Sequence, residues 1–95
     1  MALLLTENDV RQLITMPMAL EAVELAFRDV AEGTFVLHPR RRIHTPNKGF
    51  LHYMAAADFV SGYEGLKIYT YANGALRFLV PLFRWDTGEL VALIE

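Results

Sequence analysis

The chain has 95 residues, of which 54% are hydrophobic and 21% are charged, with a net charge of -2 and no cysteine. The length is that of one domain, the acidic balance gives no general attraction to nucleic acid or anionic membranes, and the lack of cysteine excludes disulfides and thiolate metal sites. No basic region of a secretory signal and no run approaching the ~20 apolar residues of a membrane helix are found. We therefore expect a cytoplasmic protein.

The hydrophobic share is high for so short a chain, whose mean hydropathy is +0.25. A small domain buries a smaller fraction of its surface than a large one, and large exposed apolar patches usually mark interfaces. Self-association through an edge or face of a sheet is the simplest way to cover such a surface. We therefore expect the chain to self-associate.

Two amphipathic helices are predicted first. Thr6 precedes acidic residues and is a helix N-cap, Pro17 suits the first turn of a second helix, and Gly33 is a helix stop. Apolar residues recur at helical spacing: Val10, Leu13 and Ile14 in the first helix, and Leu20, Val23, Phe27 and Val30 in the second, with Ala19, Ala22 and Ala26 beside them. Each helix needs a surface to lie on.

Strands are predicted after residue 33. Residues 35–45 are extended but interrupted by Pro39, and residues 50–56 form a strand. Residues 66–71 alternate, with Lys67, Tyr69 and Tyr71 on one face. Turn residues separate these segments from a closing hairpin over residues 77–95. The prediction is an α+β domain with two N-terminal helices packed on a mostly antiparallel sheet of about five to six strands.

The chain ends in an apolar run. Residues 90–94 read as a buried strand, whereas chain ends usually carry a few solvated residues. We expect residues 1–95 to form a single domain that is either a piece of a longer protein or is completed by a partner.

Three consecutive arginines, Arg40, Arg41 and Arg42, are the first candidates for chemistry. On a strand the middle arginine points to the opposite face from the other two, so at least one faces the packed layer and needs an anion such as a carboxylate. Two other interpretations stay open: an edge strand that uses charge against aggregation, and a nucleic-acid patch, which the acidic balance disfavours.

Lys67 is the next candidate, because it follows a glycine within an apolar strand. It is either an outward surface charge or a functional cation. His44 and His52 are more typical of satisfied polar residues than of ligands, and the carboxylate pattern of a metal site is missing. No glycine-rich nucleotide loop, P-loop lysine or nucleophile elbow is found, so we assign no metal site and no catalytic residue to the chain.

Six short motifs follow one another along the sequence. They are Leu3-Leu4-Leu5-Thr6-Glu7-Asn8-Asp9-Val10, Ala22-Val23-Glu24-Leu25-Ala26-Phe27, Pro39-Arg40-Arg41-Arg42, Gly49-Phe50-Leu51 with Met54, Gly65-Leu66-Lys67, and Asp86-Thr87-Gly88-Glu89-Leu90-Val91-Ala92-Leu93-Ile94-Glu95. Each is weak by itself. Together, and in this order, they closely resemble the N-terminal part of the ornithine cyclodeaminase/mu-crystallin family, over nearly the whole chain.

The resemblance implies a much longer, homodimeric enzyme. In this family an N-terminal α+β domain supplies the dimer interface and much of the substrate site, and a Rossmann domain binds NAD or NADP and carries a catalytic aspartate. Hydride passes between the nicotinamide and the α-carbon of an amino or imino acid, as in cyclodeaminases, alanine dehydrogenases and ketimine reductases. That Rossmann domain is absent from these residues, so we expect the chain alone to be inactive and to bind no cofactor tightly.

The resemblance also implies roles for single residues. Arg41 matches the family arginine after the proline, and Lys67 matches the lysine of the Gly-x-Lys strand; together they would grip the substrate's carboxylate. Two cations on neighbouring strands suit one small anion on physical grounds as well. Met54 would line the same pocket.

Two positions depart from the family pattern. His52 lies near a glutamate that some ornithine cyclodeaminases use for the substrate's distal amine, and a histidine does not supply that negative charge, which argues against ornithine. Ala75 aligns with a family threonine that approaches the nicotinamide, so this cofactor contact is doubtful.

Two functions from different classes remain. The first is the substrate-binding and dimerisation part of an NAD(P)-dependent enzyme that acts on a small amino or imino acid. The second is a stand-alone, non-catalytic module that dimerises and binds a small carboxylate. A continuation of the sequence into a glycine-rich loop would favour the first.

Overall fold

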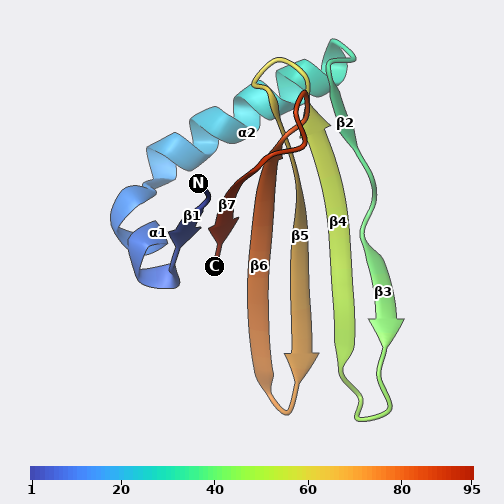
Figure 1. Ribbon diagram of the computed structural model, residues 1–95. Helices are drawn as coiled ribbons and strands as arrows, with labels where there is room; N and C mark the ends of the chain where they lie inside the picture. The colour runs from blue at the N-terminus through green and yellow to red at the C-terminus, as the bar shows by residue number, and fades with distance from the viewer.

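The computed structural model describes residues 1–95 as one mixed sheet with two helices (Figure 1). The elements in chain order are β1 (Leu3–Leu5), α1 (Glu7–Leu13), α2 (Met16–Ala31), β2 (Phe35–Leu37), β3 (Arg41–His44), β4 (Phe50–Asp58), β5 (Tyr63–Ala72), β6 (Ala75–Arg84) and β7 (Leu90–Ile94). The strand order is β1-β7-β6-β5-β4-β2, and β3 also pairs with β4.

The predicted count of five to six strands is wrong, because the sheet has seven strands. The sheet is mixed, since β1 pairs with β7 in parallel while the other pairings are antiparallel. Residues 35–45 contain two strands, β2 and β3, that both pair with β4. Pro39 lies between them, and proline has no N–H for the ladder. The three-residue β1, too short to show a pattern, pairs in parallel with β7.

Local signals set the helix ends. The Thr6 side chain accepts a hydrogen bond from the backbone N–H of Asp9, whose carboxylate accepts one from the backbone N–H of Thr6, so that α1 begins with the predicted cap. Thr15 caps α2, with Pro17 in the first turn. Gly33 follows the end of α2 with a φ of 78°, which suits glycine.

The helix α2 lies across one end of the sheet and faces it with small residues (Figure 1). Ala22 and Ala26 line the hollow between the helix and the sheet. The larger apolar residues beside them are turned away: Leu20 is 64% exposed and Phe27 is 71% exposed. The predicted stripe is therefore not the side that faces the sheet; Ala22, Leu25 and Ala26 are on that side.

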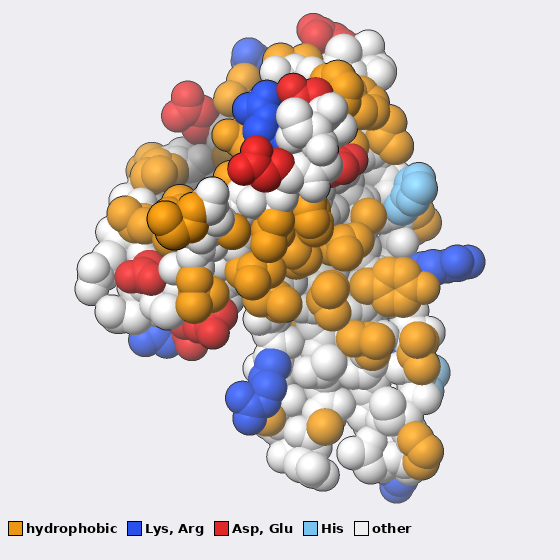
Figure 2. Space-filling model, viewed as in Figure 1, with side chains coloured by type: hydrophobic (Ala, Val, Ile, Leu, Met, Phe, Trp, Pro, Cys, Tyr) orange, Lys and Arg blue, Asp and Glu red, His pale blue; other side chains and the backbone are white.

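The sheet has two distinct faces, since paired residues of neighbouring strands point to the same side. On the side of α2, which we call the helix-side face, Met54 of β4 lies opposite Lys67 of β5. On the other side, the open face, Tyr53 lies opposite Ile68. Figure 2 views the open face, where hydrophobic side chains gather over the central strands.

The chain has little closed core. Four of its 95 residues are buried, namely Gly49, His52, Pro81 and Ala92. The radius of gyration is 14.7 Å, compared with about 12 Å for a compact domain of this length. The composition predicts an apolar surface that a partner covers, and this surface is exposed in the single chain. Neither helix combines the length and the apolar character needed to cross a membrane.

Candidate functional site

Three of the residues proposed from the sequence share the helix-side face. Met54 on β4 is paired with Lys67 on β5, and His52, two residues earlier on β4, is paired with Tyr69. Gly65 precedes Lys67 on the same strand, and a Cβ there would lie 2.8 Å from the carbonyl oxygen of Pro81. Glycine therefore lets β5 and β6 approach closely just before the lysine.

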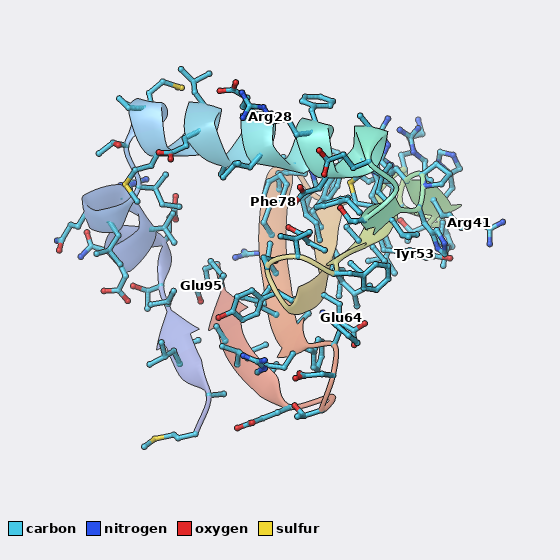
Figure 3. The ribbon with its side chains drawn as sticks, turned by 90° about the horizontal axis from the view of Figure 1, so that it is seen from above. Arg28, Arg41, Tyr53, Glu64, Phe78 and Glu95 are labelled. Atoms are coloured by element: carbon cyan, nitrogen blue, oxygen red, sulfur yellow. The ribbon has the colours of Figure 1, made fainter.

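Arg41 lies on the other side of the sheet. It is paired with Tyr53 on the open face, and Figure 3 shows these two residues near each other. The strand β4 separates β3 from β5. The structure therefore does not bring Arg41 and Lys67 together, and it places Arg42 on the face of Lys67 instead, opposite His52.

A chain of hydrogen bonds joins four side chains on the helix-side face. Arg42 Nε donates to His52 Nε2, His52 Nδ1 lies 2.6 Å from the Tyr69 hydroxyl, and Arg40 Nη1 donates to the same hydroxyl at 3.1 Å. A guanidinium can only donate, so Nε2 of His52 is the acceptor and its Nδ1 carries the proton. His52 is therefore neutral and donates to Tyr69.

Aromatic rings hold this network in place. The Phe50 ring stacks on His52 with centroids 4.1 Å apart, and the Phe78 ring stacks on Tyr69 with centroids 4.9 Å apart. Stacking fixes the planes of both rings, which restricts the directions in which His52 and Tyr69 can form hydrogen bonds.

Lys67, Arg40 and Arg42 have no carboxylate partner. The ion pairs of the structure are Arg11–Glu7 and Arg28–Glu24 on the helices and Arg84–Asp86 at the end of β6. Residues 33–57 contain no aspartate or glutamate. Lys67 Nζ lies 5.5 Å from the centroid of the Tyr69 ring, so it approaches the network from β5. The face is therefore suited to a small anion.

The positive charges around His52 agree with its neutral form. Burial lowers the pKa of His52 from its usual 6.5, and the nearby Arg42 and Arg40 lower it further. A protonated His52 would add a positive charge to an uncompensated group of cations. The histidine therefore stays neutral at pH 7 and works as a hydrogen-bonding link.

A hollow of about 640 Å³ lies between α2 and the helix-side face. Met54 and Lys67 line it together with apolar residues of β6 such as Val80 and Leu82, and Asp58 also borders it. Its volume is within the range of small-molecule pockets. Lys67 is thus placed between an apolar hollow and a polar network, which suits a ligand with an anionic group and a short carbon chain.

The remaining candidate, Ala75, begins β6 opposite Ala72 of β5. It lies at the hairpin at the end of the sheet away from α2 (Figure 1). The family motifs do not select Arg40, Arg42 or Tyr69, although Arg40 and Arg42 belong to the arginine triplet that the sequence offers as a candidate for chemistry. The alternation of residues 66–71 already placed Tyr69 on the face of Lys67, but the face of each arginine depends on how β3 pairs with β4.

The chain lacks the dinucleotide-binding motif of a Rossmann domain. In that motif a glycine-rich turn between a strand and a helix holds the diphosphate, and no such turn is found among these residues. No group of three or more His, Asp or Glu side chains lies together as potential metal ligands.

The fold of the chain matches the fold of known enzymes. No protein-family model and no curated protein sequence matches the chain. Among solved structures, an archaeal alanine dehydrogenase, described as a dimer with bound NAD, is 32% identical with a TM-score of 0.87; the match covers 98% of this chain and 30% of the enzyme.

Two further enzymes agree with this match. The Δ1-pyrroline-2-carboxylate reductase of Thermococcus litoralis, in complex with NADH and L-proline, is 27% identical with a TM-score of 0.89, over 98% of this chain and 31% of the reductase. A probable ornithine cyclodeaminase from Bordetella pertussis is 24% identical with a TM-score of 0.91, over 100% of this chain and 30% of the enzyme.

The chain thus spans about a third of the length of these structures. All of them are enzymes of the type that the six sequence motifs indicate, and the match extends over the whole chain. The resemblance of this chain to the N-terminal part of the ornithine cyclodeaminase/mu-crystallin family is therefore confirmed.

Proposed function

We propose that the chain is the substrate-binding part of an NAD(P)-dependent enzyme acting on a small amino or imino acid, and that Lys67 binds the substrate's carboxylate. The observation that carries this proposal is the position of Lys67, on a face whose cations lack carboxylate partners and beside a hollow of suitable size. The match to alanine dehydrogenase at 32% identity supports the reaction class.

The contribution of this chain is to bind and orient. Its cations hold the carboxylate end of the substrate, and the hollow beneath α2 takes the carbon chain. In this proposal the nicotinamide cofactor and the residues that move protons belong to the part of the enzyme that the relatives have beyond these 95 residues.

The second cation of the carboxylate site is an arginine of residues 40–42. The family motif assigns Arg41, whereas the pairing of β3 with β4 favours Arg42, which lies on the face of Lys67. A guanidinium matches a carboxylate with two parallel hydrogen bonds. Because the two arginines are neighbours on opposite faces, substituting each in turn separates the two assignments.

The proposal includes a homodimer formed through the open face. Hydrophobic side chains gather over the central strands of this face (Figure 2), and α2 lies on the other side of the sheet (Figures 1 and 3). The radius of gyration is larger than a compact domain requires. The related alanine dehydrogenase is a dimer. A second copy of the same face provides an apolar partner of the same size and shape.

The test of the carboxylate site is an NMR titration of the chain with butyrate. Lys67→Met should weaken binding by roughly 1.5–3 kcal/mol, the contribution of one charge-assisted hydrogen bond, while Lys48→Met, in the turn between β3 and β4, should leave binding unchanged. Arg42→Gln should weaken binding more than Arg41→Gln. Unchanged affinity in the Lys67 variant would contradict the proposal.

A further inference from the structure

The Tyr69 hydroxyl has a free proton to donate. Its oxygen accepts hydrogen bonds from Arg40 Nη1 and from the Nδ1 proton of His52, which occupies both lone pairs. No acceptor for its own O–H lies within hydrogen-bonding distance in the structure. The neutral form of His52, set by Arg42, leaves the phenol as a donor.

The groups that the network leaves unpaired are hydrogen-bond donors, because its two acceptors, His52 Nε2 and the Tyr69 oxygen, are already used. Each guanidinium has five N–H groups, and Arg40 and Arg42 each use one of them within the network. Lys67 adds an ammonium group near the same ring. A ligand that has only acceptors, such as a carboxylate, satisfies such a group of side chains.

The number of cations exceeds what one carboxylate needs. One carboxylate is matched by Lys67 and one arginine, as in the proposed function. Arg40 and the Tyr69 hydroxyl then remain, on the same face and without an anionic partner. Both Arg40 and Arg42 are exposed, so their free N–H groups are accessible to a ligand that arrives from solvent.

The distance between Lys67 and Tyr69 suits a short ligand with two acidic groups. Lys67 and Tyr69 are two residues apart on β5 and point to the same side, so about 7 Å separates their Cα atoms. A four- or five-carbon chain with a carboxylate at each end can contact both side chains.

We infer that Tyr69 and Arg40 bind a second acidic group of the substrate, so that the substrate is a small dicarboxylic amino or imino acid. This inference rests on the proposed function, in which Lys67 holds the first carboxylate. It makes Tyr69 and Arg40 residues that determine specificity, and it assigns His52 a positioning role, because His52 directs the Tyr69 hydroxyl.

The test compares two four-carbon ligands, succinate and butyrate, which differ in one carboxylate, by NMR titration of the chain at neutral pH. Succinate should bind about tenfold or more tightly than butyrate, as expected for one added charge-assisted contact. Tyr69→Phe and Arg40→Gln should abolish this preference by lowering the affinity for succinate to that for butyrate. Arg40 is exposed, so its substitution leaves the fold intact should the Tyr69 variant be unstable.

Arg41→Gln is the matched control, since it removes the same charge from the open face and should preserve the preference for succinate. Equal affinities for succinate and butyrate would overturn the inference and leave the carboxylate site of Lys67 standing. Inorganic phosphate is the third ligand: tight phosphate binding that depends on Arg40, without a preference for succinate, would also overturn it. Loss of the Lys67 dependence alone would instead refute the proposed function.

Discussion

The two faces of the central sheet differ in chemistry although the same strands form them. On the helix-side face, Arg42, His52 and Tyr69 form a chain of hydrogen bonds beside Lys67. On the open face, Tyr53 lies opposite Ile68, and hydrophobic side chains gather over the central strands (Figure 2). Alternation along a strand thus allows one segment to bind a polar ligand on one side and an apolar partner on the other. Neighbours in sequence, such as Arg41 and Arg42, have different surroundings.

The largest expected effect comes from placing a charge on the open face. Leu79 is paired with Ile68 on this face and is 36% exposed. Leu79→Glu should weaken self-association by ~100-fold or more, because an unpaired charge buried in an interface costs at least about 3 kcal/mol. Sedimentation velocity over a range of concentrations measures this change.

The matched control places the same charge on the other face. Leu76 is on the same strand, is paired with Tyr71 on the helix-side face and is 50% exposed. Leu76→Glu should leave association unchanged. Equal loss of association in both variants would mean that the open face is not the interface.

A smaller effect is expected on the stability of the folded chain when His52, on the helix-side face, becomes protonated. Because the pKa of His52 is lowered in the folded chain by burial and by the nearby arginines, the unfolded chain binds this proton more readily. The contribution of His52 to stability is therefore complete above its usual value of 6.5 and is lost as the pH falls below it. Urea denaturation at several pH values should show this decline.

His52→Gln should remove that pH dependence between about pH 7.5 and 5.5, whereas His38→Gln, which leaves the network intact, should preserve it. A decline of the same size in the His52 variant would show that another group is responsible. Because the two variants remove one histidine each, their formal charge changes are the same.

The smallest effect is expected where α2 meets the sheet. Burial raises the pKa of Asp29, and the nearby Asp58 carboxylate raises it further. Since the folded state favours protonated Asp29, its ionised form costs stability above the folded pKa, and this cost disappears at low pH. Asp29→Asn should therefore raise the melting temperature near pH 7.

The gain should vanish as the pH falls below the usual aspartate value of 3.8, because Asp29 is then protonated in both the folded and the unfolded chain. Glu21→Gln, on an exposed position of α2, controls for the change in net charge. A stabilisation that persists unchanged at low pH would contradict the assigned cause.

Parts of the fold are predictable because their signals are local. Thr6 and Pro17 mark helix starts through groups that lie within a few residues of them, and Gly33 marks a helix end. The strand count failed where the signal is not local. The parallel pairing of β1 with β7 joins the two ends of the chain, and three leucines carry no periodicity that would reveal a strand.

The site divides in the same way. The pattern around Lys67 predicts a strand with a cation, and the family resemblance adds Met54 and His52 from the preceding motif; all three share the helix-side face. The alternation of β5 also places Tyr69. The arginine that accompanies Lys67 is different, because three consecutive arginines satisfy any motif equally well, and only the register with β4 decides which of them shares the face.

The sequence by itself determined the class of protein, the two helices and the segment that carries the cations, because composition, caps and motif order are properties of neighbouring residues. Only the tertiary structure decided which side of α2 meets the sheet, that β1 joins β7, and that Arg40 and Arg42 lie with His52 and Tyr69. These features depend on strand register and on close approach between distant segments, and a shift of one residue in register would move every side chain of β3 to the opposite face.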